Sequence, residues 1–183
     1  MRKVILSMVM SLDGYVAGEN GDSSWHVMDQ EMDEYMENLL DSADTLLYGR
    51  RAYEMMIQYW PSAEFDPNNS EESRAFARKI NQKKKAVFTR TLNKVEWNAI
   101  AVKGNIAFEV RKWKQQPGQD LVLLAGADIA QTFIQEDLID EFRLILNPVV
   151  IGNGVRLFHN RMRKLELIET HTFQCGNVLL VYK

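Results

Sequence analysis

Short apolar runs alternate with amphipathic helical segments along most of the chain, and this alternation limits the possible fold more than any other feature. Buried strands are predicted at Val4–Met10, Thr45–Tyr48, Ala86–Thr89, Asn98–Val102 and Leu121–Ala125. Between them apolar residues recur at helical spacing, which predicts helices at 29–42, 53–57, 70–80, 105–114 and 129–138. Strands that alternate with helices favour a mostly parallel sheet covered on both faces.

The last part of the chain has a different pattern. Strands are predicted at Phe142–Leu146, Leu165–Phe173 and Val178–Tyr182, and Cys175–Asn177 gives the last two a hairpin turn. The expected fold class is therefore α/β, a three-layer α/β/α arrangement whose mostly parallel, twisted sheet ends in an antiparallel C-terminal hairpin. A chain of 183 residues suits one hydrophobic core, so residues 1–183 are expected to form a single domain.

Charge and composition exclude several classes of function. A net charge of -3 offers no long-range attraction for nucleic acid or an anionic membrane. No apolar run approaches the roughly 20 residues of a membrane span, and the first ten residues are expected to form a strand rather than a signal peptide. The single cysteine, Cys175, cannot form an internal disulfide, and no Cys/His cluster has zinc-site spacing. We expect a soluble cytoplasmic protein without a bound metal.

The turn after the second predicted strand is a candidate phosphate site. In open α/β sheets ligands lie beyond the carboxyl ends of the strands, and phosphates favour helix N-termini. Gly49 lets the backbone approach a phosphate closely, and the guanidinium groups of Arg50 and Arg51 suit phosphate oxygens. On spacing alone, a helix start carrying two solvated arginines explains the same residues better.

Two more strand ends carry similar residues. Gly126, Ala127 and Asp128 follow the fifth strand, where small residues would let a pyrophosphate rest on the first turn of the next helix. Thr89 and Arg90 end the third strand and offer a hydroxyl group and a guanidinium group. Tight helix packing and an ordinary polar turn are the competing interpretations.

The segment after the first strand turns and then returns to apolar residues. Val16 and Ala17 are thereby able to lie against a flat ring. Asp13 is a catalytic candidate, although an Asx-turn would also explain it. The apolar, glycine-containing stretch from Val149 to Phe158 favours a homodimer, because it would be costly to expose, but it also fits a structural crossover.

Two carboxylates lie near the start of the first helix. Asp29 and Asp33 are four residues apart and share a helix face just after Trp25. A buried carboxyl group there could supply or relay a proton. N-capping by Asp29 and solvation of Asp33 are alternatives of equal weight.

Taken in order, these segments resemble the dihydrofolate-reductase-like superfamily, in particular the single-domain relatives of the RibD C-terminal domain, the reductase half of the riboflavin-biosynthesis deaminase/reductase. The resemblance spans nearly the whole chain. Its most specific elements are Ser11–Gly14, Tyr48–Arg50, Asp140–Glu141, Pro148–Gly154 and Leu157–Phe158.

The resemblance implies an NADPH-dependent reductase. It puts Gly49, Arg50 and Arg51 near the adenosine phosphates, Thr89 and Arg90 by the adenosine, Gly126, Ala127 and Asp128 under the pyrophosphate, and Val16 and Ala17 beside the nicotinamide. A 2′-phosphate needs a fixed cation, so the arginines after Gly49 favour NADPH over NADH.

The sequence also departs from the family pattern. Tyr15 stands where the riboflavin-pathway enzyme commonly has a lysine suited to a phosphorylated sugar, Ala52 where a hydroxyl residue is common, and Ala125 where a glycine is common. The implied substrate is either 5-amino-6-(5-phosphoribosylamino)uracil or a pterin such as dihydrofolate. A non-catalytic, nucleotide-binding dimeric module of the same fold is the alternative.

Overall fold

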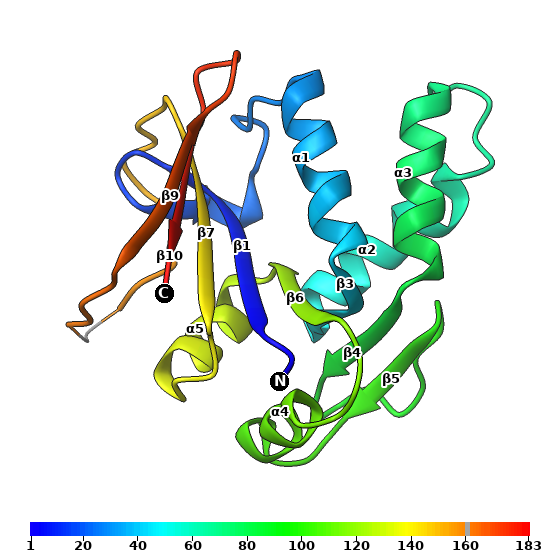
Figure 1. Cartoon of the computed structure of the whole chain (residues 1–183). Helices are drawn as coiled ribbons and strands as arrows, with labels where there is room; N and C mark the ends of the chain where they lie inside the picture. Colours follow the sequence, from blue (N-terminus) through cyan, green and yellow to red (C-terminus); the bar gives the residue numbers. More distant parts are fainter. Residues whose placement is uncertain (160–161) are drawn as a thin grey trace.

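The computed structural model describes residues 1–159 and 162–183 (Figure 1). The elements within them are β1 (Val4–Ser11), β2 (Tyr15–Ala17), the 3-10 turn η1 (Glu19–Gly21), α1 (Gln30–Asp41), β3 (Ala43–Gly49), α2 (Arg50–Ala63), α3 (Glu71–Gln82), β4 (Lys84–Phe88), β5 (Ala99–Val102), α4 (Ile106–Lys114), β6 (Asp120–Ala125), α5 (Ala127–Gln135), β7 (Glu141–Asn147), β8 (Val155–Arg156), β9 (Leu167–Thr172) and β10 (Val178–Tyr182).

Eight of these strands form one sheet in the order β5-β4-β3-β6-β1-β7-β10-β9. Neighbours from β5 to β7 run parallel, whereas β10 pairs antiparallel with both β7 and β9. The predicted fold class, a mostly parallel sheet with an antiparallel C-terminal hairpin, is confirmed. A separate antiparallel pair, β2 with β8, was not predicted, because strands of three and two residues are too short to show a period.

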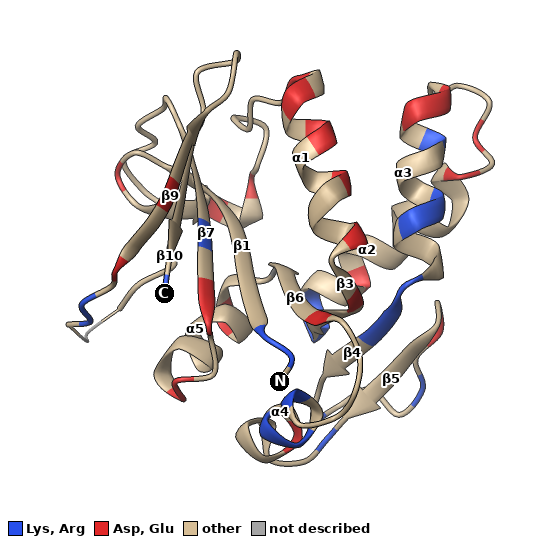
Figure 2. Ribbon diagram, viewed as in Figure 1, with Lys and Arg blue, Asp and Glu red and all other residues tan. Residues whose placement is uncertain are grey.

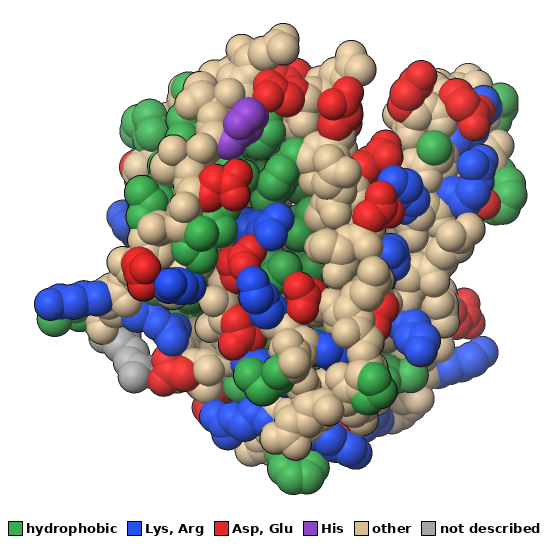
Figure 3. Space-filling view, in the orientation of Figure 1, with side chains coloured by type: hydrophobic (Ala, Val, Ile, Leu, Met, Phe, Trp, Pro, Cys, Tyr) green, Lys and Arg blue, Asp and Glu red, His purple; other side chains and the backbone are tan. Residues whose placement is uncertain are grey.

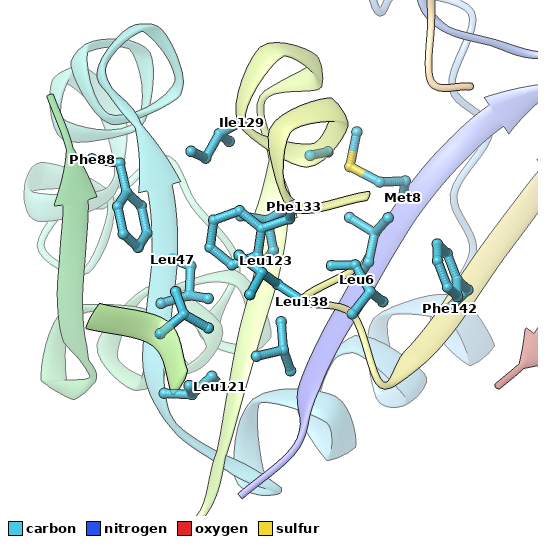
Figure 4. Close-up of a cluster of buried hydrophobic side chains, with 14 of the residues drawn as sticks. Leu6, Met8, Leu47, Phe88, Leu121, Leu123, Ile129, Phe133, Leu138 and Phe142 are labelled. Carbon is cyan, nitrogen blue, oxygen red and sulfur yellow. The ribbon is translucent and has the colours of Figure 1, made fainter. Parts of the chain in front are cut away.

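Helices cover both faces of the sheet, because alternate residues of each central strand point to opposite sides. Leu46 and Tyr48 of β3 pack in the core with α1, α2 and α3. Leu47, between them, packs in the core with α4 and α5, where Figure 4 shows it on the same side as Phe133 of α5 and Leu123 of β6. This double burial explains why the central strands are continuous apolar runs in the sequence.

Two helices differ clearly from their predicted ranges. α2, predicted at 53–57, begins at Arg50 and continues through Pro61 to Ala63, and the Asn69 side chain donates to the carbonyl of Ala63 over 3.0 Å. α5 ends at Gln135, because Asp137 takes a left-handed φ of 53° that a helix cannot continue. Leu138, predicted on this helix, is buried in the connection to β7 instead. None of the helices within residues 1–159 and 162–183 combines the length and the apolar character needed to cross a bilayer.

Candidate functional site

A cleft of about 2050 Å³ runs along the carboxyl ends of the parallel strands. One part, the strand-tip half, is lined by the segments that follow β3, β4, β5 and β6, namely 49–52, 89–91, 103–105 and 126–129. The other part, the helix half, is lined by side chains of α1, α2 and α3, namely Asp33, Glu34, Met36, Glu37, Met55, Met56, Tyr59, Trp60, Glu72, Ser73 and Phe76. Figure 3 shows the notch between the ends of α1 and α3 where the cleft opens.

Two of the helices that begin in the strand-tip half lack side-chain caps. α1, α3 and α4 are capped by the side chains of Asp29, Ser70 and Asn105, each of which accepts a hydrogen bond from a first-turn N–H. α2 and α5 follow Gly49 and Gly126 and have no such acceptor. First-turn N–H groups without a side-chain acceptor, at the positive end of the helix dipole, are the donors that bind phosphate groups in α/β proteins.

Close packing holds these two helix starts together. The register of β3 with β6 pairs Tyr48 with Ala125, so the two helices begin at adjacent strand ends. Gly126 has a left-handed φ of 96°, and a Cβ there would lie 3.2 Å from both the Cβ of Ala52 and the Cγ2 of Ile129. Glycine is therefore required at this position, and its small size leaves the backbone of both turns open to the cleft.

Cations of the strand-tip half differ in how far they are already paired. Arg50 Nη1 lies 3.1 Å from the Glu54 carboxylate one turn further along α2. Arg51 Nη1 lies 3.4 Å from Asp128 Oδ2, and both side chains are mostly exposed. Arg90 has no ion-pair or hydrogen-bond partner in the part of the chain that the structure describes. Of the predicted guanidinium groups, that of Arg90 is the freest to meet an incoming anion.

Thr89 shapes the turn that presents Arg90. Its hydroxyl oxygen accepts hydrogen bonds from the backbone N–H groups of Thr91 at 3.2 Å and Leu92 at 3.0 Å. The side chain is buried, so it acts mainly as a turn former, as the polar-turn interpretation of the sequence had it.

Val16 and Ala17 line the inner end of the cleft, beside Met8 of β1. Both belong to β2, which pairs with β8. A Cβ at Gly154, just before β8, would collide with the carbonyl oxygen of Ala17, so this approach also requires glycine. The predicted apolar surface for a flat ring is present at this position.

Asp13 and Asp29 do not line the cleft, and both carboxylates serve as acceptors for backbone groups. Asp13 accepts from the N–H of Ile151 at 3.3 Å and of Gly152 at 2.8 Å, and the hydrogen bond with Ser11 is the largest cause that lowers its pKa. Asp29 caps α1 through Met32 N at 2.8 Å and also accepts from Cys175 N at 2.7 Å. Both hydrogen bonds lower the pKa of Asp29, and the one from Met32 N is the larger cause. Each carboxylate ties two distant segments together.

Asp33 is the one predicted catalytic acid that lines the cleft. Desolvation, followed by the negative charges of Asp29 and Glu37, raises its pKa. Within residues 1–159 and 162–183 its carboxylate has no hydrogen-bond or ion-pair partner, and the residue is exposed rather than buried, as the solvation interpretation of the sequence had it. A carboxyl group of this kind holds its proton to higher pH than an ordinary aspartic acid.

His26 and the apolar wall of the helix half were not predicted. His26 lines the cleft in the loop before α1, and burial lowers its pKa, so the imidazole is neutral at pH 7. Its Nε2 has no hydrogen-bond partner among the described residues. Met55 and Tyr59 of α2 are exposed and lie outside the stripe of Tyr53, Met56 and Trp60 that packs against the core, and this position was the sequence signal that could have marked them.

Comparison with known proteins adds a family and several relatives. The family described as RibD C-terminal domain matches residues 2–181. YyaP, an uncharacterised protein of Bacillus subtilis (strain 168), is 40% identical over 183 residues, which cover 99% of this chain and 94% of that protein.

Solved structures share the fold at low sequence identity. A protein from Shewanella sp. PV-4, provisionally assigned to riboflavin biosynthesis, superposes with a TM-score of 0.74 at 23% identity, over 98% of this chain and 97% of that one. Dihydrofolate reductase from Enterococcus faecalis, solved with NADP(H), gives a TM-score of 0.66 at 12% identity, over 98% and 95% of the two chains. The likeness confirms the predicted dihydrofolate-reductase-like architecture.

Proposed function

The chain belongs to the RibD C-terminal domain family, and on that premise we propose that it is a single-domain, NADPH-dependent reductase whose active site is the cleft at the strand ends. The observation that carries this proposal is the pair of adjacent helix starts at Gly49 and Gly126, which lack side-chain caps and whose close packing, with the left-handed φ at 126, favours glycine there. Three other helices have side-chain caps, so the missing caps distinguish these two adjacent turns.

The size of the strand-tip half supports a dinucleotide. Three strand spacings separate β4, which ends near Arg90, from β1, which lies beside Val16. At about 4.8 Å a spacing, this is about 14 Å, enough for a dinucleotide in extended form. Thr89 and Arg90 then meet the adenosine, Gly49 to Arg51 and Gly126 to Asp128 the phosphates, and Val16 and Ala17 the nicotinamide.

Asp128 does not exclude a pyrophosphate from the first turn of α5. A lone carboxylate there would repel it, but the guanidinium group of Arg51 lies 3.4 Å away and offsets the charge. The residues present therefore fit NADPH, with Arg50 and Arg90 as cations for the 2′-phosphate.

When bound, NADPH supplies the hydride. The chain's own residues bind and orient the cofactor through the two helix starts, and the apolar surface of Val16 and Ala17 keeps water from one face of its ring. Asp33, with its raised pKa, holds the proton that reduction requires on the substrate side of the cleft. Asp13 and Asp29 fix the surrounding loops and touch no reacting atom.

Titration with NADPH and NADH tests the cofactor part directly. Trp60 lines the cleft, so we expect NADPH to quench tryptophan fluorescence and to raise the melting temperature, and NADH to do both more weakly. If neither cofactor changes either signal, the proposed function is wrong.

Transfer of deuterium from stereospecifically labelled NADPH to an acceptor tests turnover. A reductase places the label from one face of the nicotinamide only. Tight NADPH binding without label transfer to any pyrimidine or pterin acceptor would instead favour the non-catalytic nucleotide-binding module.

We also propose that the protein is a homodimer. β9 forms an edge of the sheet, all of its residues are exposed, and Leu167 and Ile168 are 52% and 51% exposed. In the stretch predicted to form the interface, Val150 is 68% exposed, whereas Leu157 is buried in the core. Light scattering that gives the mass of one chain would exclude a stable dimer.

A further inference from the structure

Charge is distributed unequally over the two halves of the cleft. The cationic side chains that line it are Arg50, Arg51, Arg90 and Lys103, and all four belong to the strand-tip half. Carboxylates line the helix half, namely Asp33, Glu34 and Glu37 of α1 and Glu72 of α3. In Figure 2 acidic residues, in red, recur along α1 and stand at the start of α3.

Little positive charge compensates these carboxylates. Lys79 Nζ lies 2.9 Å from Glu37, and it lies equally close to Asp41. Among the described residues, Glu34 accepts a hydrogen bond only from the neutral amide of Gln30. Neither Asp33 nor Glu72 has an ion pair within residues 1–159 and 162–183. The helix half therefore presents a negative potential to whatever enters it.

The same half has an apolar and aromatic wall that is open to solvent. Met55 is 59% exposed and Tyr59 is 51% exposed, although both line the cleft. Behind them the ring of Trp60 lies 5.0 Å from that of Tyr59 and 5.4 Å from that of Phe76. A flat ring that covers this wall would release its water, and methionine adapts to varied ring shapes.

The cationic side chain of β8, that of Arg156, is not available to a ligand in the cleft. Arg156 donates to the hydroxyl of Tyr15 over 3.0 Å, and its guanidinium group lies 4.5 Å from the centre of the Tyr15 ring. Tyr15 in turn donates to the carbonyl of Gly152 over 3.3 Å, and neither Tyr15 nor Arg156 lines the cleft. Tyr15 therefore holds this neighbouring cation away from the cleft.

We propose that the hydride acceptor of this protein is a flat ring that is neutral or cationic, carries an apolar substituent and has no phosphate group. The proposal rests on the proposed reductase function and names the substrate class of the same cleft. A phosphorylated sugar in the helix half would add about two negative charges beside Asp33, Glu34 and Glu72, with no free cation among the described residues of that half to meet them. In the strand-tip half, Arg50 and Arg90 would meet the 2′-phosphate of the cofactor, Arg51 pairs with Asp128, and Lys103 donates to the side chain of Asn93.

The first experiment measures binding to the NADPH-loaded protein by calorimetry. Two matched pairs serve as ligands: 5-amino-6-(5-phosphoribosylamino)uracil with its dephosphorylated form, and a benzyl-substituted 2,4-diaminopyrimidine, protonated at pH 6, with the uracil that carries the same benzyl group. We expect the dephosphorylated compound to bind at least about tenfold more tightly than the phosphorylated one, and the protonated ring to bind most tightly.

Tighter binding of the phosphorylated compound, or no binding of any of the four ligands to the loaded protein, would overturn the substrate class. Failure of the proposed function has a different signature, because the protein would then not bind NADPH in the first place. Titration with NADPH therefore tests the proposed function, and titration of the loaded protein with the four ligands tests the substrate class.

A charge variant tests the cause. Glu34→Gln combined with Glu72→Gln removes two negative charges from the helix half and should tighten binding of the phosphorylated compound about three- to tenfold, while weakening that of the protonated ring. Glu166→Gln combined with Glu169→Gln makes the same charge change near and on β9, outside the cleft, and should alter neither affinity. Equal effects of the two double variants would contradict a local electrostatic cause.

Discussion

The strand-tip half and the helix half of the cleft are built from different parts of the chain. The strand-tip half depends on backbone: two helix starts that meet at Gly49 and Gly126, with Ala52 packed between them. The helix half depends on side chains, which are carboxylates on α1 and α3 and methionine and aromatic residues on α2. Backbone N–H groups are enough to bind a portion of a ligand that many proteins share. The portion that differs from one substrate to another has to be recognised by side chains, because these can vary between proteins.

The largest effect is expected where the backbone itself would be obstructed. Gly126→Ala should weaken NADPH binding at least about tenfold, because its Cβ forces Ala52 and Ile129 apart and the two helix starts with them. Gly152→Ala is the matched control, since its φ of 77° is also left-handed but its Cβ would meet nothing within 4 Å. Similar NADPH dissociation constants for the two variants would show that close approach at Gly126 does not matter.

The second prediction tests whether a side chain of the strand-tip half helps the protein to bind NADPH in preference to NADH. Arg90→Ala should weaken NADPH about tenfold and NADH by less than about twofold, because a charge-assisted hydrogen bond to the 2′-phosphate is lost. Arg50→Ala should have a smaller effect of the same kind, since Glu54 already competes for that guanidinium group. Arg74→Ala, outside the cleft, is the control. Equal losses for both cofactors would remove the 2′-phosphate role from Arg90.

Asp33 allows the helix half to be tested through pH. A carboxyl group whose pKa is raised on folding stabilises the protein below its unfolded pKa, and this contribution is lost as pH rises through the folded pKa. The neutral amide of Asp33→Asn would mimic the protonated form, and because solvent screens this exposed site, the variant should have a melting temperature at most about 1 °C higher at pH 7 and unchanged at pH 3. In the unaltered protein we expect kcat/KM to be high at low pH and to fall as pH rises through the pKa of Asp33. In Asp33→Asn this fall should be absent. If Asp33→Asn still shows this fall in kcat/KM, another group holds the proton, and His26 is the next candidate.

The smallest effect on ligand binding is expected at Asp29, which lies in neither half. Asp29→Ala should lower the melting temperature by about 2–4 °C, because α1 loses its cap and the turn at Cys175 loses an acceptor, while NADPH binding should not change. Asp29→Asn keeps one acceptor and should recover part of the loss. Since the pKa of Asp29 is lowered, the stabilisation by its carboxylate is lost as pH falls through the folded pKa. A weaker affinity for NADPH in Asp29→Asn would contradict a purely structural role.

Local pattern was sufficient for the parallel strands and the glycine turns, because both depend on short stretches of chain. A strand buried on both faces must be almost wholly apolar, as Val4–Met10 is apart from Ser7, and a tightly packed strand-to-helix turn favours glycine, as at Gly49 and Gly126. The order of these segments was enough to indicate the family. The strand pair β2 with β8 could not be predicted in this way, because its two strands come together only after the chain has crossed the sheet.

Tertiary structure decided between interpretations that the sequence left equal. Asp13 and Asp29 proved to be acceptors for backbone groups more than a hundred residues away, at Gly152 and Cys175, and nothing within a few residues of either aspartate encodes those partners. The helix half likewise exists because α1, α2 and α3 pack on the same face of the sheet and leave the exposed side chains of Met55 and Tyr59 lining a cleft. Periodicity and turn chemistry act between neighbours in sequence, whereas the surroundings of a side chain depend on which distant segments fold against it.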